Sequence, residues 1–384
     1  MNKPKICHVS TVHRGVEIRI IRKELVSLAE AGYDAHAILS ATPAEVAEAR
    51  QLGITIHPLP ESQENHRFAR MTSKMYTAWK RCREVDADLY HFHDPELIPF
   101  GLLLKCFGYR VVMDVHEDLA NQILTKHWIP PWARRMVARL SRTAERIGAR
   151  FFDGVVTATP RQAAFFEDVA KRVVVAHNYP LLHELTLPAT ENGDHDNQPT
   201  APRPNTHVAY IGAITRIRGI NETLQAIEKA DVKLLLAGTF RNDKERQEAM
   251  SLPGWSRVED IGWVSRKEVA QILKRSFAGM CILHPTSSHL NSEPIKLFEY
   301  MAAGIPGIVS SIPDWVHYVE KHNTGICVDP MDIDAIAQAI ITLRDNPDMA
   351  AEMGRNGQRA VLEHYNWSPQ GEKLKILYQQ ILGV

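Results

Sequence analysis

The sequence predicts an α/β protein built from two Rossmann-like domains, each with a parallel sheet covered by helices. Short apolar strands alternate with longer amphipathic segments along the chain, as they do where helices connect parallel strands. A chain of 384 residues is also too long for one ordinary hydrophobic core. Residues 180–205, rich in Pro, Asn, Asp and Thr, interrupt the alternation and divide the chain in two.

Each half supplies a series of expected strands, with helical or looped segments between most of them. In the first half the strands are expected at 5–10, 34–39, 54–59, 88–93, 110–115, 154–159 and 172–177. In the second half they are expected at 207–212, 232–238, 256–262, 277–284, 304–311 and 324–329. The segment 17–33 has the pattern of the helix after the first strand, and the chain from Met331 onward is helical by period.

These elements predict a domain at 1–180, a linker at 181–206 and a second domain at 207–365. A C-terminal helix at 366–384 is expected to pack back toward the first domain. Ligands of open parallel sheets bind at the carboxyl ends of the strands. Two such sheets facing each other would therefore place a site in the cleft between them.

The composition narrows the class of function. Lys plus Arg and Asp plus Glu both number 45, so the chain has no overall attraction to nucleic acid. The five cysteines are scattered without a CxxC pair, which indicates reduced thiols and not disulfides or a zinc site. The N-terminus lacks a signal-peptide core, and no apolar run is long enough to span a bilayer. A cytoplasmic protein is therefore expected.

The stretch NSEPIKLFEYMAAG, residues 291–304, predicts a helix whose start can bind an anion. Pro294 suits the first turn and Gly304 the position after the last. Free N–H groups near Ile295 and Lys296, with the lysine charge, would suit a diphosphate. Glu299 lies three residues after Lys296 on the same side, where its carboxylate could accept two hydrogen bonds from a ribose diol. Taken alone, an ordinary surface Lys–Glu pair is the simpler interpretation.

Two other segments add to this motif. In YIGAITRIRG, Gly212 lets the backbone approach a ligand closely, and Arg216 and Arg218 could clamp phosphate oxygens. In VEDIGWV, residues 262–264 follow a strand and offer an edge to which a nucleobase could hydrogen-bond. The alternatives are solvated loop arginines in the first segment and an ordinary strand-to-helix turn in the second.

The C-terminal half resembles the nucleotide-sugar domain of retaining GT-B glycosyltransferases of family 4, the glycosyl transferases group 1. PIKLFEYMAAG is similar to one form of the family motif, in which Glu299 matches the glutamate that holds the ribose. Asn291 stands where the family has a first glutamate that contacts the donor sugar. Arg218 matches the basic residue of the phosphate-binding segment, whereas Ala213 replaces the other one. The donor residues that the resemblance implies are Gly212, Arg216, Gly262, Trp263, Val264, Asn291, Ser292, Glu293, Ile295, Leu297 and Glu299.

The N-terminal half resembles the same family more loosely, through the segment 7–38 and the strand ends HDPEL and DVHED. His116 matches the family histidine that approaches the donor sugar. The acceptor side that the resemblance implies comprises His13, Arg14, Gly15, Glu17, Arg19, Asp94 and Glu117. For most of the residues from 13 to 19, a solvated helix start is the alternative.

The resemblance implies a retaining GT-B hexosyltransferase, in which Arg218 and Lys296 stabilise the leaving diphosphate and His116 contacts the donor sugar. The donor would be a nucleotide sugar, by default a UDP-sugar. The acceptor would be a saccharide or a lipid-linked saccharide of bacterial surface polysaccharide synthesis. No metal ion, cofactor or protein nucleophile is then expected. A nucleotide-sugar 2-epimerase and a non-catalytic nucleotide-sugar-binding subunit remain as alternatives.

The segment 126–150 suggests a membrane surface as a further partner. Trp132, Met136, Val137, Leu140, Ala144 and Ile147 recur at helical spacing, and six arginines crowd the remaining faces against the single acid Glu145. Such a helix could lie on an anionic bilayer, which makes a peripheral membrane protein the hypothesis. The alternative is that the apolar stripe packs on the N-terminal sheet.

Overall fold

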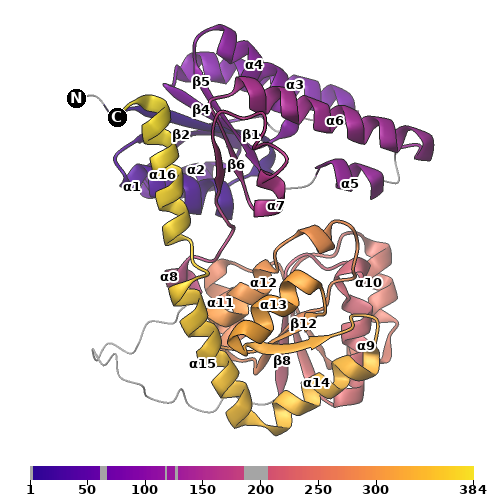
Figure 1. Ribbon diagram of the computed structural model, residues 1–384. Coiled ribbons are helices and arrows are strands. Elements are labelled where there is room, and N and C mark those ends of the chain that lie inside the picture. The colour runs from indigo at the N-terminus through magenta and orange to yellow at the C-terminus, as the bar shows by residue number, and fades with distance from the viewer. Residues whose placement is uncertain (1–2, 61–66, 117–118, 126–128, 186–205) are drawn as a thin grey trace, which may run out of the picture. The chain divides into compact units, whose positions relative to one another are not determined.

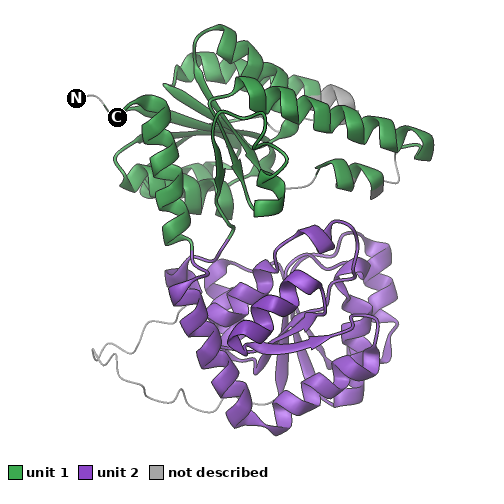
Figure 2. Ribbon diagram, viewed as in Figure 1, with its two compact units in different colours: residues 1–178, 367–384 green, residues 179–366 purple. Residues whose placement is uncertain are grey.

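The computed structural model divides into two compact units (Figure 2). Unit 1 comprises residues 1–178 and 367–384, and unit 2 comprises residues 179–366. The structure describes the chain except for residues 1–2, 61–66, 117–118, 126–128 and 186–205. Most of the expected linker therefore lies outside the described residues, although a short helix, α8, forms at its start, at Leu182–Leu185.

Unit 1 is built on a seven-stranded parallel sheet in the order β3-β2-β1-β4-β5-β6-β7 (Figure 1). Every strand expected in the first half is present, although β1 continues four residues beyond its expected end at residue 10. The bounds are β1 Lys5–Arg14, β2 Asp34–Ser40, β3 Ile54–Pro58, β4 Leu89–Phe92, β5 Arg110–Val115, β6 Gly154–Thr157 and β7 Val173–Val175.

The helices of unit 1 cover both faces of this sheet. They are η1 Ile18–Leu25, α1 Val26–Glu30, α2 Pro43–Gln51, α3 Arg67–Val85, η2 Pro95–Leu97, α4 Ile98–Cys106, α5 Leu119–Thr125, α6 Pro131–Phe151, α7 Pro160–Ala163 and α16 Ser368–Leu382. Side chains of a strand alternate between the two faces of the sheet. Cys7 and Tyr90 point to the face that is covered by α3, α4 and α6. His8 and His91 are paired in register and point to the opposite face, where Tyr378 of α16 contacts both of them.

Unit 2 repeats the design with a six-stranded parallel sheet in the order β10-β9-β8-β11-β12-β13. All six strands expected in the second half are present. Their bounds are β8 His207–Ile211, β9 Lys233–Ala237, β10 Val258–Gly262, β11 Ala278–Cys281, β12 Gly307–Ser310 and β13 Gly325–Val328. The helices are η3 Arg216–Arg218, α9 Ile220–Ala230, α10 Asp243–Met250, η4 Pro253–Arg257, α11 Arg266–Lys274, η5 His289–Asn291, α12 Ile295–Ala302, α13 Pro313–His322, α14 Ile333–Asp345 and α15 Pro347–Glu363.

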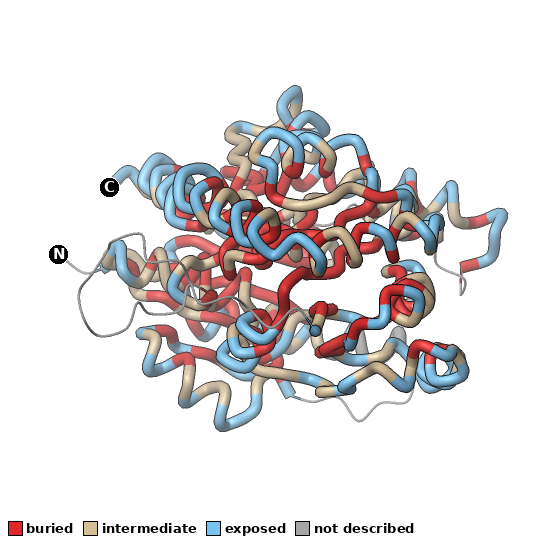
Figure 3. The backbone as a smooth tube through the Cα atoms, turned by 90° about the horizontal axis from the view of Figure 1, so that it is seen from below, coloured by how far each residue is buried: buried red, intermediate tan, exposed pale blue. Residues whose placement is uncertain are grey.

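Buried residues follow the strands and the inner sides of the helices in each unit (Figure 3). In both sheets the strand order reverses next to the first strand, between β1 and β4 in unit 1 and between β8 and β11 in unit 2. Such a switch point leaves a crevice at the carboxyl ends of the two strands, where ligands of this fold class bind. Functional side chains are therefore sought at these two positions.

Candidate active site

The helix α12 has the boundaries that its sequence predicts. Pro294 directly precedes the first residue of α12. Gly304 follows the end of the helix and adopts the left-handed conformation, at φ 70°. One expectation is wrong: the backbone N–H of Ile295 is not free, because it donates to the carbonyl oxygen of Glu293 at 3.0 Å. Leu297, expected among the donor residues, has its side chain fully inside the core of unit 2.

Lys296 and Glu299 form the pair that their spacing predicts, and a third residue joins them. Lys296 Nζ lies 2.7 Å from Glu299 Oε2, and Arg266 Nη1, at the start of α11, lies 2.9 Å from Glu299 Oε1. The Nε atom of Arg266 also contacts Glu184 Oε2 at 2.9 Å. The sequence analysis missed Arg266, since only the folded chain brings it to a carboxylate 33 positions away.

Glu299 is a buried carboxylate that stays ionised. Only 5% of its surface is exposed, and this burial acts to raise its pKa. The charges of Lys296 and Arg266 outweigh burial and bring the pKa of Glu299 to about 2. Each carboxylate oxygen has lone pairs beyond those used by the two cations, so this group can still accept hydrogen bonds from a ligand's hydroxyls.

Gly212 lies directly after β8, beside the switch point of unit 2. A Cβ atom added there would lie 3.2 Å from Lys296 Cε and 3.8 Å from Arg218 Nη1, so both cations converge over a residue without a side chain. The N–H of Gly238, after β9, donates to Gly262 O at 2.7 Å. A Cβ atom on Gly238 would lie 1.8 Å from Gly212 O, so the turns after β8 and β9 meet at backbone level.

The turn η3 holds the two arginines that were expected to bind phosphate. Gly219 ends this turn at φ 70°, and a Cβ atom there would lie 1.9 Å from the carbonyl oxygen of Ile282. The N–H of His284 donates to Ile217 O at 2.9 Å, which ties the turn to the segment after β11. Glycine is therefore required for η3 to pack against the other side of the switch point.

The remaining donor residues lie around this centre in different environments. In η5, Asn291 Nδ2 donates to Ser287 O at 2.8 Å, and Ser292 Oγ donates to His289 O at 3.0 Å. Gly262 ends β10 at φ 76°, and the next residue, Trp263, is 79% exposed. Asn291 is held by its own turn, whereas Trp263 offers a large uncovered aromatic surface at a strand end.

The switch point of unit 1 carries charged and imidazole side chains. His116 Nδ1 lies 3.3 Å from Asp114 Oδ2, and its ring centroid is 5.3 Å from that of His13. Asp114 is fully buried, which acts to raise its pKa. Arg19 binds both carboxylate oxygens, at 2.8 and 3.0 Å, and holds the pKa of Asp114 well below its usual range. His116 therefore lies beside a permanently ionised carboxylate.

Several residues expected on the acceptor side have structural partners instead. Arg19 is buried against Asp114 and is no loop side chain. Asp94 is buried and accepts hydrogen bonds from Ser10 Oγ at 2.9 Å and from the Thr11 N–H at 2.6 Å, so it shapes the end of β1. These contacts use both groups to build the fold, and their assignment to the acceptor stays a prediction.

Among the remaining acceptor candidates, some make structural contacts and others are accessible. Glu17 caps η1 through the N–H of Ile20, at 2.7 Å, and the open side of Gly15 faces the carboxylate of Glu45. Arg14 is exposed at the end of β1, and Glu117 lies outside the described residues. Of this set, Arg14 is exposed, and His13 is half-buried with its ring beside that of His116.

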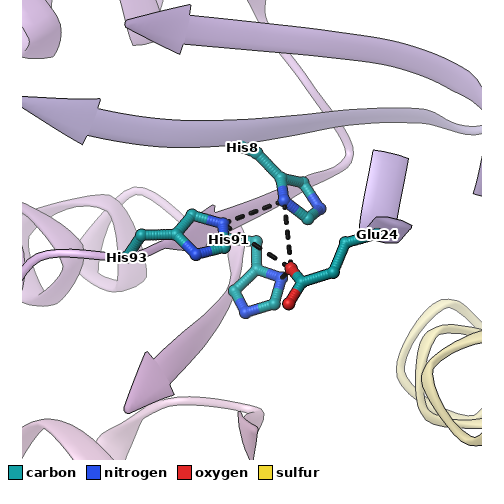
Figure 4. A group of neighbouring side chains, drawn as sticks. All are labelled: His8, Glu24, His91 and His93. Carbon is teal, nitrogen blue, oxygen red and sulfur yellow. Dashed lines mark hydrogen bonds and ion pairs between the residues drawn. The ribbon is translucent and has the colours of Figure 1, made fainter. Parts of the chain in front are cut away.

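A second cluster lies deeper in unit 1, and the sequence analysis did not foresee it. His8 of β1, Glu24 of η1, His91 of β4 and His93 after β4 are all buried and turned toward one another (Figure 4). Burial lowers the pKa of each histidine, which favours the neutral form of the rings. Burial, with the charge of Asp114, raises the pKa of Glu24 even though Arg19 opposes it.

Comparison with known proteins gives a glycosyltransferase family model for each half of the chain. Residues 192–360 match the family model described as Glycosyl transferases group 1. Residues 15–178 match the model described as Glycosyl transferase 4-like domain. D-rhamnosyltransferase WbpZ of Pseudomonas aeruginosa is 27% identical over 293 residues, which span 73% of this chain and 71% of that protein.

Other relatives are similar over nearly the whole length. Phosphatidyl-myo-inositol mannosyltransferase of Mycolicibacterium smegmatis is 24% identical, over 96% of this chain and 91% of that protein. The solved structure of Anabaena Alr3699/HepE in complex with UDP and glucose has a TM-score of 0.71 at 14% identity, covering 98% of this chain and all of that one. With the two parallel sheets, this likeness confirms the predicted GT-B fold.

Proposed function

We propose that the chain is a member of the glycosyl transferases group 1 family and transfers a hexosyl residue from a nucleotide sugar, with retention of the anomeric configuration; the family-model matches to residues 192–360 and 15–178 support this. The acceptor is a saccharide or a lipid-linked saccharide of bacterial surface polysaccharide. The observation that carries this proposal is the convergence of Arg218 and Lys296 over Gly212, with Glu299 beside them, at the switch point of unit 2.

Each part of that site fits one part of a nucleotide sugar. Arg218 and Lys296 bind the diphosphate, whose negative charge grows as the bond from the sugar's anomeric carbon to the phosphate oxygen breaks. The ionised carboxylate of Glu299 accepts hydrogen bonds from the ribose diol. The backbone edge at 262–264 receives the base. A UDP-sugar is the default donor, supported by the UDP and glucose bound in the Anabaena structure.

The other roles are proposed for residues beside this donor site. His116, held by Asp114, hydrogen-bonds the donor sugar or its phosphate during transfer. Asn291 replaces a charged contact to the sugar with an amide. The departing phosphate takes up the proton of the acceptor hydroxyl, so the mechanism uses no protein nucleophile.

A panel of nucleotide sugars tests the proposal. Thermal shift identifies the donor, and the product formed without an acceptor then identifies the activity. Slow release of the nucleotide with free sugar supports a transferase, epimer formation indicates a 2-epimerase, and binding without turnover indicates a non-catalytic subunit. With an acceptor, NMR of the early product reports the anomeric configuration, and an inverted product contradicts retention.

We also propose that the acceptor is met at an anionic membrane surface through α6. The stripe does not pack on the sheet: Trp132 is 79% exposed and Leu140 62%, and Met136, Ala144 and Ile147 are also exposed. Val137 packs in a small cluster with residues of α5. Arg135, Arg139 and Arg150 are exposed along the same helix. The proposed contact is peripheral, because an amphipathic helix of this kind lies in the plane of the bilayer surface. No helix among the described residues has the length and apolarity needed to cross a bilayer.

Sedimentation with vesicles tests this surface. Binding should require anionic lipid, weaken as salt rises, and fall in an Arg135→Glu, Arg139→Glu, Arg150→Glu variant, because each basic residue contributes about 1 kcal/mol near the surface. A matched variant of unit 2, Arg241→Glu, Lys244→Glu, Arg355→Glu, carries the same change in charge at exposed positions and should bind like wild type. Wild-type protein that ignores anionic vesicles at low salt would contradict the proposal.

A further inference from the structure

We propose that His8, Glu24, His91 and His93 form a structural site for a divalent transition metal, best matched by Zn²⁺, inside unit 1. The four residues come from β1, η1 and the segment of β4, and one ligand atom of each lies within 4.8 Å of all the others. Their side chains point at one shared centre (Figure 4). Three imidazoles and one carboxylate are a donor set that zinc takes in proteins.

The distances between these atoms fit tetrahedral coordination. Bond lengths of about 2.0 to 2.1 Å to nitrogen and oxygen place tetrahedral ligand atoms about 3.3 Å apart. His8 Nδ1 lies 2.9 Å from His93 Nε2 and 3.6 Å from Glu24 Oε2. From the same carboxylate oxygen, His93 Nε2 lies 3.8 Å away and His91 Nδ1 lies 3.9 Å away. The observed separations thus lie on both sides of the ideal value.

The outer partners orient two of the rings as metal ligands. His93 Nδ1 lies 3.0 Å from Asp114 Oδ2, so it carries the proton and leaves the Nε2 lone pair turned to the centre. His8 Nε2 lies 2.9 Å from the Tyr378 hydroxyl, which can accept its proton and leave Nδ1 as the ligand. The hydroxyl proton of Tyr378 can rotate, so His91 Nδ1, also 2.9 Å away, is not committed to it.

Glu24 is a second, independent sign that a cation belongs here. Both of its carboxylate oxygens are buried without a hydrogen-bond partner among the described residues. Arg19 Nε lies 3.1 Å from Glu24 Oε1, but the Arg19 guanidinium is already bound to Asp114 through two nitrogen atoms. Buried carboxylates are normally paired or bound to a metal. A metal ion would supply the missing charge.

The closed ligand set assigns the metal a structural role. All four ligands come from the protein and none of them is exposed, which leaves no open position for a substrate. The metal would fasten η1 to the two central strands at the switch point. It would also fix His93 and, through the shared carboxylate of Asp114, support the position of His116.

Metal content of the full-length protein tests this site independently of transfer activity. Protein grown with zinc should contain close to one equivalent by mass spectrometry. After removal of the metal, Co²⁺ should produce the intense visible absorption of tetrahedral coordination. Glu24→Gln and His93→Gln should lose the metal, and Tyr378→Phe should bind it about tenfold more weakly. His57→Gln is the matched control, since His57 and His36 form another histidine pair in unit 1, at 2.9 Å.

If the glutamine variants fail to fold, His93→Cys keeps a ligand at the same position. Its Co²⁺ complex should gain a thiolate-to-metal charge-transfer band in the near ultraviolet that wild type lacks. The proposal is overturned by less than a tenth of an equivalent of metal with only weak octahedral cobalt absorption, or by a His93→Cys complex without the new band. Those results would indicate a metal-free hydrogen-bonded cluster, whether or not the chain transfers sugar.

Discussion

Glu24 in unit 1 and Glu299 in unit 2 are both buried carboxylates beside a switch point, yet their pKa values move in opposite directions. Glu299 has two cations, Lys296 at 2.7 Å and Arg266 at 2.9 Å, and its pKa falls to about 2. Burial and the negative charge of Asp114 raise the pKa of Glu24, although Arg19, at 3.1 Å, opposes them. Burial acts alike on Glu24 and Glu299, and the charges beside each carboxylate decide the direction of its pKa shift.

The difference suits the two proposed roles. An anion that is already stabilised by two cations can accept hydrogen bonds from a sugar hydroxyl without having to be ionised first. A buried carboxylate without enough positive charge is instead suited to bind a cation. Under these two proposals, a glutamate binds a polar ligand in one unit and a metal ion in the other.

The largest expected effect is the loss of the anion in unit 2. Glu299→Gln keeps the shape of the side chain but removes its charge, and turnover should fall by about 30- to 1000-fold, equivalent to about 2 to 4 kcal/mol. Steady-state kinetics and nucleotide binding measure this, with folding checked by circular dichroism. Glu259→Gln, which removes a carboxylate from an exposed pair with Arg275, should behave as wild type. Wild-type nucleotide affinity in Glu299→Gln would end the ribose assignment.

The second effect is a dependence of stability on pH. The pKa of Glu299 in the folded protein, about 2, lies below its ordinary value of 4.5. Its ionised form therefore stabilises the fold by about 3 kcal/mol above pH 4.5, and this is lost as pH falls toward 2. Urea unfolding at pH 5, 4 and 3 should show the stability gap between wild type and Glu299→Gln shrinking with acid. The gap for the exposed Glu363→Gln should stay constant.

The third effect comes from Arg266, the residue that the sequence analysis missed. Arg266→Ala should lower the free energy of unfolding by about 2 kcal/mol, because it removes the charged hydrogen bonds that Arg266 makes to Glu184 and Glu299. In the Glu299→Gln background the same substitution should cost less. A double-mutant cycle measures this coupling. Additive costs would mean that the pair makes no net contribution.

The smallest effect is expected at His116. His116→Ala should reduce turnover about tenfold, the value of one hydrogen bond to a charged group, while nucleotide affinity stays unchanged. Isothermal titration measures the nucleotide affinity, and steady-state kinetics measure the turnover. The control is His36→Ala in the same unit, which should retain turnover. Turnover near wild type in His116→Ala would make this histidine a structural partner of Asp114.

The sequence predicted the strands of both sheets and the helix α12 because these depend on local apolar periodicity and on capping residues. The Lys296–Glu299 pair was also predictable, because side chains three residues apart on a helix are neighbours on its surface. Arg266 and Glu24 were not predictable, because their partners are set by how distant elements pack. Arg19 was misjudged since its neighbours in sequence are turn residues, whereas its partner Asp114 lies 95 positions away.

The return of residues 367–384 to unit 1 has a consequence for synthesis on the ribosome. While unit 2 is being translated, unit 1 still lacks α16, so the sheet face of His8 and His91 has no Tyr378 partner. The surface beside Gly154 likewise waits for Leu377 and Ile381. Unit 1 emerges first but completes last, and a nascent chain that stalls within unit 2 presents an uncovered sheet face to chaperones and proteases.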